Sequence, residues 1–111
     1  MTEQVFELEP NGGVKQTILG ADLAAGQTLQ YTVPPFVWFG SYPTKDIESF
    51  ASDGSLLVKA PPRDPETHYS LVGCTCAPAF QFQDFELASR AEILSINSIA
   101  KPFIEYLTPS D

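Results

Sequence analysis

The sequence predicts an all-β domain of the sandwich or barrel type with one short helix near its C-terminus. Seven glycines and ten prolines interrupt the 111 residues, and the eight Phe, four Tyr and one Trp lie mainly in the short segments between these breaks. Short apolar runs with frequent turn signals are typical of all-β sandwiches and barrels. At this length, residues 1–111 are expected to form a single domain.

The first predicted strands form a hairpin. Residues 5–8 and 14–19 are apolar runs joined through Asn11-Gly12, a pair that tolerates the positive φ values of a tight hairpin turn. Residues 28–33 alternate apolar and polar side chains, which predicts a half-buried strand. Two prolines then end this strand, and residues 37–42 form an aromatic-rich extended segment.

The middle of the chain is more polar. Residues 43–54 contain four charged side chains, residues 56–59 predict a short strand, and residues 60–67 are a Pro-rich loop. We expect these stretches to form an excursion between strands, outside the core.

The last third contains the most apolar predicted strand, residues 69–76, which Pro78 ends. Ser89 and Glu92 have the S-x-x-E spacing of a capping box, so a short helix is predicted over residues 90–95. The tail is expected to dock on the domain through its apolar residues Phe103, Ile104, Tyr106 and Leu107.

Charge and hydropathy exclude several classes of function. The formal net charge is -8, with 6 Lys and Arg against 14 Asp and Glu, so the basic patch that binds nucleic acid is absent and anionic membrane surfaces are disfavoured. No apolar run approaches the length of a membrane span, and MTEQVFELEP has no signal-peptide pattern. These features predict a cytoplasmic protein.

The two cysteines, Cys74 and Cys76, are expected to be reduced thiols. Two residues apart in a strand, they leave the same face with Cβ atoms too far apart for easy disulfide geometry. As a zinc site, the pair lacks the further Cys or His ligands that zinc requires.

Two segments carry a longer pattern. Residues 20–40 are GADLAAGQTLQYTVPPFVWFG, and residues 68–88 are HYSLVGCTCAPAFQFQDFELA. They resemble the second half of the cupin-5 family, a domain of largely unknown function among the sugar-epimerase-like cupins, with the patterns DLxxG, VPxGxWQ and YxLVGCTVxPGFxFxDFEL. The resemblance implies a cupin-type jelly roll or β-barrel.

The chain departs from that family in several places. The His-rich first cupin motif is absent, which implies a truncated barrel, and residues 41–67 resemble an insertion. Phe36 and Ala79 replace family glycines, and Phe39 replaces the usual Gln after the Trp.

These departures bear on metal binding. Metal-dependent cupins hold a divalent ion with two His and a Glu of the first motif and one His of the second. Here the first set is missing, and the second-motif position falls on Phe39, which cannot ligate. His68 is the one histidine of the chain, so we expect neither a metal nor another cofactor.

Two acidic residues are the best candidates for acid–base chemistry. Asp84 and Glu86 lie among Phe82, Phe85 and Leu87, a setting that could raise the pKa of a carboxyl group. The alternative is structural: Asp84 caps a turn and Glu86 binds backbone. The epimerase-like cupins use a His–Asp pair with a Tyr, mainly in the missing half, and His68 is expected at the surface or rim. Any catalysis would therefore use Glu86 with Tyr69 or Tyr31.

Aromatic side chains define a candidate ligand pocket. The predicted lining consists of Trp38, Tyr31, Phe80, Phe82, Asp84 and Phe85. Barrels present such apolar pockets at their mouths, although aromatic residues on strands also serve as core packing.

A half-barrel would expose strand edges and an apolar sheet face, so we expect a homodimer or another protein chain that completes the sheet.

Three functions follow from these features. The first is a metal-free cupin-like protein that binds a small organic ligand in an aromatic-lined pocket. The second is a degenerate cupin that acts as a structural or protein-interaction subunit. The third is an isomerase, epimerase or cyclase that uses Glu86 as acid or base.

Overall fold

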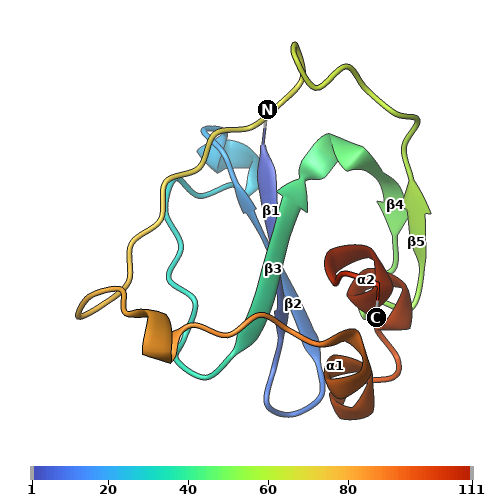
Figure 1. The fold of residues 1–111 in the computed structure, drawn as a ribbon. Coiled ribbons are helices and arrows are strands. Elements are labelled where there is room, and N and C mark those ends of the chain that lie inside the picture. Colours follow the sequence, from blue (N-terminus) through green and yellow to red (C-terminus); the bar gives the residue numbers. More distant parts are fainter. Residues whose placement is uncertain (1, 111) are drawn as a thin grey trace.

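The computed structural model describes residues 2–110 as two small antiparallel sheets and two helices (Figure 1). The larger sheet has the strand order β2-β1-β3, and the smaller one pairs β4 with β5. The strands are β1 (Glu3–Leu8), β2 (Val14–Leu19), β3 (Trp38–Pro43), β4 (Ile47–Phe50) and β5 (Leu57–Lys59), the helices are α1 (Arg90–Ile96) and α2 (Lys101–Leu107), and three 3₁₀ turns cover Leu23–Ala25, Thr44–Asp46 and Phe82–Asp84. The described residues therefore form mostly strands with two helices, one more than predicted, and no closed barrel.

The N-terminal hairpin confirms the sequence prediction. β1 and β2 pair antiparallel, with Glu3 opposite Leu19. Gly12 has a φ of +88°, and its N–H donates to the Glu9 carbonyl at 2.9 Å. Only glycine adopts such a φ without steric cost, so the Asn-Gly signal places the turn correctly.

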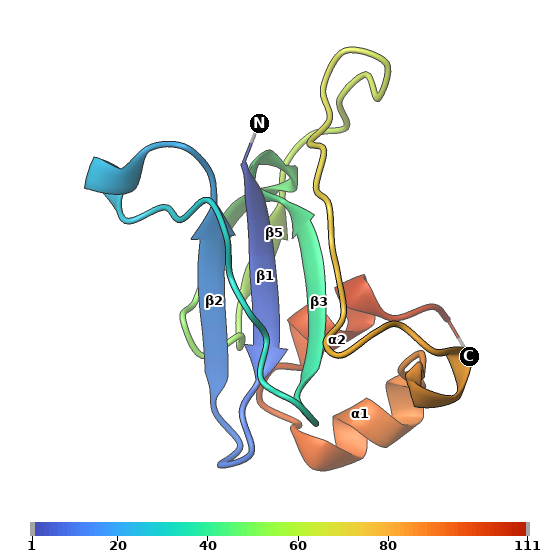
Figure 2. The ribbon, with the colours of Figure 1, turned by 90° about the vertical axis from the view of Figure 1, so that its left-hand side faces the viewer.

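One face of the larger sheet forms the core. The smaller sheet and α2 lie behind the larger sheet in Figure 2. The ring of Phe103, with 0% of its surface exposed, stacks on Phe6 with the ring centroids 4.8 Å apart. The buried apolar residues of this core are Phe6, Leu8, Tyr42, Ile47, Ile93, Ala100, Phe103 and Ile104. The prediction that the C-terminal tail docks on the domain is confirmed, and the tail does so as a helix.

The two helices begin in different ways. α1 starts at Arg90 as predicted, but the capping box is wrong, because the Ser89 side chain makes no capping hydrogen bond. Asn97 organises the approach to α2 instead. Its Oδ1 accepts from the Ala100 N–H at 3.1 Å, and its Nδ2 donates to the Gly12 carbonyl at 2.8 Å. Asn97 thereby ties the helices to the N-terminal hairpin.

The polar stretch 43–54 is not the excursion that the sequence predicted. Residues 47–50 form β4, which pairs with β5, and the side chain of Ile47 is buried in the core. Leu57 of β5 packs against the same core. The sequence of β4, Ile-Glu-Ser-Phe, does not alternate apolar and polar residues, so no sequence pattern marks it as a strand. Only Ile47 of its four residues is buried.

Two predicted strands, residues 28–33 and 69–76, are wrong. Thr28 makes only an isolated bridge to Leu19, and residues 69–80 make no backbone hydrogen bond within the described chain. Both stretches are extended and run on the side of the larger sheet away from β4 and β5 (Figure 1). An apolar pattern favours a strand, but a ladder also needs a partner strand, which residues 2–110 do not supply here.

Tyr42 makes the stability sensitive to alkaline pH. Burial, and then the neighbouring Tyr106, raise the pKa of the Tyr42 phenol above its usual value of 10.0. The unfolded chain loses this proton near pH 10 while the folded chain keeps it, so stability present below that pH falls as the pH rises further. Urea unfolding of wild type from about pH 8 to about pH 11 should show this fall, and Tyr42→Phe should reduce it. The exposed control Tyr69→Phe should behave as wild type; equal slopes for all three proteins would contradict the assignment.

Candidate functional site

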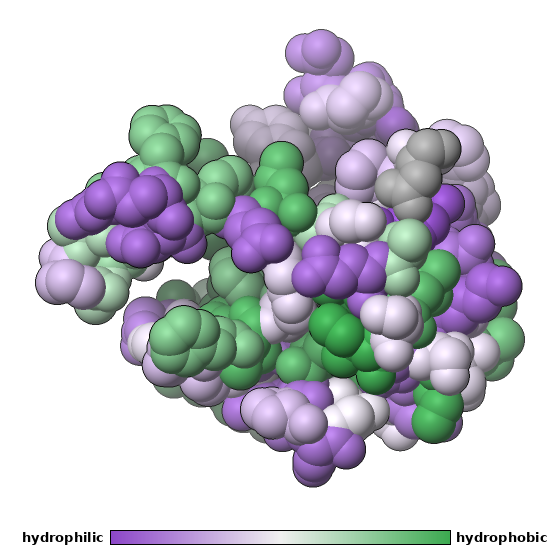
Figure 3. All heavy atoms as spheres, turned by 60° about the horizontal axis from the view of Figure 1, so that its bottom comes forward, coloured by the Kyte–Doolittle hydropathy of each residue, from purple (hydrophilic) through white to green (hydrophobic). Residues whose placement is uncertain are grey.

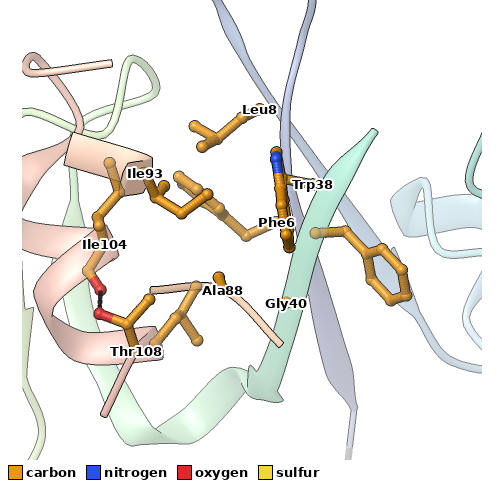
Figure 4. A pocket seen from close by; sticks show the side chains of 10 residues that line it. Phe6, Leu8, Trp38, Gly40, Ala88, Ile93, Ile104 and Thr108 are labelled. Atoms are coloured by element: carbon orange, nitrogen blue, oxygen red, sulfur yellow. Dashed lines mark hydrogen bonds between the residues drawn. The ribbon is translucent and has the colours of Figure 1, made fainter. Parts of the chain in front are cut away.

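Trp38 lies at a small apolar hollow between the larger sheet and the helices (Figure 4). The hollow has a volume of about 60 Å³. Its lining consists of Phe6, Leu8, Trp38, Phe39, Gly40, Ala88, Ile93, Ile104, Leu107 and Thr108. Because pockets for organic ligands usually have about 300–1,000 Å³, and one water in liquid takes about 30 Å³, this hollow is too small to enclose such a ligand.

The predicted aromatic pocket does not assemble around Trp38. Phe80 packs against Phe82 and Phe85, with ring centroids 5.0 and 5.8 Å apart, and all three side chains are exposed. Asp84 belongs to the 3₁₀ turn beside them. These residues form a cluster of their own that lines neither hollow described here.

The acid–base candidates do not line one common hollow of the two described here. Glu86 is exposed and Tyr31 half-buried, and both lie outside the two hollows described here, whereas Tyr69 lines the second, polar one. Neither of these two hollows therefore brings Glu86 together with Tyr69 or Tyr31.

The second hollow is polar and larger, at about 340 Å³. It lies where the end of β3 meets the Pro-rich loop, and its lining consists of Pro43, Asp46, Arg63, Pro65, His68, Tyr69 and Ser70. Only Tyr69 of this set was a predicted site residue. Pro43, Asp46, Arg63 and Pro65 were missed because they come from stretches that the sequence assigned to an excursion. His68 was expected only at the surface or rim, and Ser70 lay in the strand predicted over residues 69–76.

Arg63 organises this polar hollow. Its Nη2 forms an ion pair with Asp46, and its Nη1 donates to the His68 carbonyl at 3.3 Å. Its Nε is buried without a hydrogen-bond partner. On the same side, the Ser70 hydroxyl donates to the Glu3 carboxylate. The charges of Asp46 and Arg63 in the lining therefore offset each other, and the Glu3 carboxylate lies beside the hollow through its hydrogen bond with Ser70.

A nearby tyrosine responds to these charges. Burial raises the pKa of Tyr106, Asp46 and Glu3 raise it further, and Arg63 opposes them. The charged rim of the polar hollow therefore acts on a side chain that packs against the core.

A second polar cluster lies on the other face of the larger sheet. Glu7 is only 2% exposed, and its Oε1 accepts a hydrogen bond from the Tyr31 hydroxyl at 2.6 Å. Lys15, opposite Glu7 in the ladder, holds its Nζ 4.9 Å from the centroid of the Tyr31 ring. Tyr31 first, and then Glu7 and Glu9, raise the pKa of Lys15.

Tyr31, a predicted ligand-binding residue, is therefore already engaged by protein. Its segment runs across the sheet and covers the Glu7 carboxylate. The sequence contained a signal for Glu7, because alternation in β1 places it on the face opposite Phe6 and Leu8. Because a carboxylate on that face of a strand is usually solvated, the alternation alone does not predict that Glu7 is buried.

A family model described as Cupin_5: Cupin superfamily (DUF985) matches residues 3–88. The chain belongs to the cupin-5 family. No curated protein and no solved structure matches it. The match begins at β1 of this cupin chain and ends just before α1, so the resemblance seen in the sequence is confirmed.

Both helices of this cupin lie beyond the matched residues, yet they supply Ile93, Ala100, Phe103 and Ile104 to its core. The core of the matched segment is thus completed by side chains from residues 89–110.

The position where the family pattern has a glycine keeps a glycine-like backbone. Phe36 has a φ of +62°, and its side chain is fully exposed. A positive φ costs a non-glycine residue about 1–2 kcal/mol. The turn before β3 therefore holds an aromatic ring in solvent at a cost to stability.

Within residues 2–110 of this cupin, no three His, Cys, Asp or Glu side chains gather closely enough to hold a metal ion, and no helix is long and apolar enough to cross a membrane. Both cysteines are free and exposed.

Proposed function

We propose that this cupin acts as a protein-interaction subunit and that residues 69–80, the docking segment, pair with the docking segment of a second copy. The observation that carries the proposal is the unpaired backbone of this segment within the described chain, extended over residues 69–76. Unpaired N–H and C=O groups of an extended chain are a template for strand addition.

The side chains of the docking segment favour association as well. Leu71 is 93% exposed, and Tyr69, Val72 and Phe80 are also open to solvent. Apolar side chains reach the surface of the molecule in Figure 3. With Phe82 and Phe85, these side chains present on the order of 700 Å², close to the share of about 800 Å² that each partner contributes to a stable interface.

Charge favours a second copy as the occupant. Residues 69–83 contain no charged side chain, whereas the whole chain carries a net charge of -8. Two copies repel one another over most of their surfaces, and they can approach through this uncharged stretch. An antiparallel strand is also its own complement across a two-fold axis.

Light scattering over a range of concentrations tests the proposal. Wild type should form a dimer, and Leu71→Asp should be monomeric, because it places a carboxylate at the centre of the paired segment. Leu23→Asp is the matched control, since Leu23 is 63% exposed and lies in the Leu23–Ala25 turn. It should dimerise as wild type does. A wild-type monomer at all concentrations, or equal dimerisation of Leu71→Asp, would contradict the proposal; circular dichroism checks that each variant is folded.

A second candidate function rests on the polar hollow, whose volume of about 340 Å³ lies in the range of ligand pockets. We propose that it admits a small organic ammonium ion, because the Glu3 carboxylate, which accepts from Ser70 of the lining, lies beside it and the Tyr69 ring offers a cation–π surface. Nuclear magnetic resonance titration with choline should shift signals of the hollow in wild type, and Tyr69→Ala should abolish the shifts. Shifts that persist in Tyr69→Ala, or none in wild type, would count against this site.

A further inference from the structure

Two thiols lie close together in the docking segment. Cys74 and Cys76 are both free and both exposed, and no charged side chain lies between residues 69 and 83. Over residues 69–76 the segment is extended in Figure 2, before the bend at Ala77 and Pro78, and its backbone makes no hydrogen bond within the described chain. The pair can therefore adjust its geometry without breaking a ladder.

The spacing of the thiols suits a bridging ion better than a disulfide. Side chains two residues apart in an extended chain leave the same face, with the backbone rising about 6.6 Å between them. A disulfide needs Cβ atoms about 3.5–4.5 Å apart. Two collinear metal–sulfur bonds of about 2.3 Å hold the sulfur atoms about 4.6 Å apart, which two side chains leaning toward each other can reach.

The number of donors selects the kind of ion. Zinc requires about four ligands, and no third His, Cys, Asp or Glu joins these thiols among residues 2–110. A soft monovalent ion such as Cu(I) is satisfied by two thiolates in a line, and thiolates select Cu(I) over hard cations. The net charge of -8 also favours the approach of a cation.

We propose that Cys74 and Cys76 of one chain form a two-thiolate binding site for Cu(I). Each thiol loses its proton as its sulfur binds, so one Cu(I) releases two protons, forms two Cu–S bonds and transfers no electron. This site goes beyond the proposed interaction function and does not depend on it, because both donors come from the same chain.

Anaerobic titration with Cu(I), supplied as its acetonitrile complex against a colorimetric copper chelator, tests the site. Wild type should bind one Cu(I) per chain, show an ultraviolet thiolate-to-copper band and release two protons. Cys74→Ser and Cys76→Ser should each lose stoichiometric binding and the band. Thr75→Ala keeps both thiols and should bind as wild type.

The Leu71→Asp variant separates this proposal from dimerisation. It should bind one Cu(I) per chain whether or not wild type is a dimer. Binding that survives in Cys74→Ser or Cys76→Ser would overturn the site. So would one Cu(I) per two chains, or loss of binding in Leu71→Asp, since the thiols would then act between copies.

Discussion

Replacing Phe103 by alanine is expected to lower the free energy of unfolding by about 3–5 kcal/mol. The Phe103 ring is fully buried, stacks on Phe6 at 4.8 Å and meets Phe50 edge-on at 5.8 Å. Alanine would remove these contacts and leave a cavity that the sheet and helix cannot fill. Urea denaturation followed by circular dichroism measures the loss.

Phe82→Ala is the matched control for this substitution. The Phe82 side chain is exposed outside the core, so its loss should change the free energy of unfolding by less than about 0.5 kcal/mol. If Phe103→Ala costs no more than Phe82→Ala, α2 is not docked on the sheet as described.

Gly54→Ala is expected to destabilise the protein by about 2–4 kcal/mol, for two reasons that add. Gly54 has a φ of +83°, which strains any residue with a Cβ. The added Cβ would also lie 2.8 Å from the Ala100 Cβ and 3.2 Å from the Ala100 Cα, which belongs to the backbone before α2. The turn before β5 and the start of α2 would have to separate.

Gly12→Ala separates the two causes. Gly12 has a similar φ of +88°, but an added Cβ would meet no atom within 4 Å. This control should cost only the strain, about 1–2 kcal/mol. Thermal and urea unfolding of both variants give the comparison, and equal losses would show that Ala100 does not press on Gly54.

Local signals predicted the parts of the fold that local contacts form. The hairpin turn at Asn11-Gly12, the strand 14–19 and the start of the first helix at Arg90 all appear in the structure. Turn chemistry depends on residues a few positions apart, so a sequence pattern can reveal it. The helix start at Arg90 agrees with the prediction although the capping box that predicted it does not form.

The strands that depend on distant partners were predicted less well. Residues 69–76 have the most apolar pattern of the chain and still form no strand within it. Conversely, β4 has a weak pattern and is a strand because β5 lies beside it. A strand needs a neighbour as well as a propensity, and propensity is all that a local pattern measures.

The candidate site shows the same limit. The sequence singled out Tyr69 and Tyr31, and the structure gives each a polar setting: Tyr69 beside Arg63 and Asp46, Tyr31 against Glu7. Those partners lie 6 to 24 positions away along the chain. A sequence motif with fixed spacing cannot predict such pairs, because the folding of the intervening loops brings the partners together.

Charge, turn chemistry and cupin-5 membership were thus already present in the amino-acid sequence, because each depends on composition or on short ordered motifs. The tertiary structure alone decided which apolar residues are core and which remain open. Phe103 and Leu71 are both large apolar side chains, yet one is fully buried and the other 93% exposed. Burial depends on which surfaces the folded chain brings against a side chain. Here α2 packs against the larger sheet, whereas residues 69–80 have no partner strand among residues 2–110.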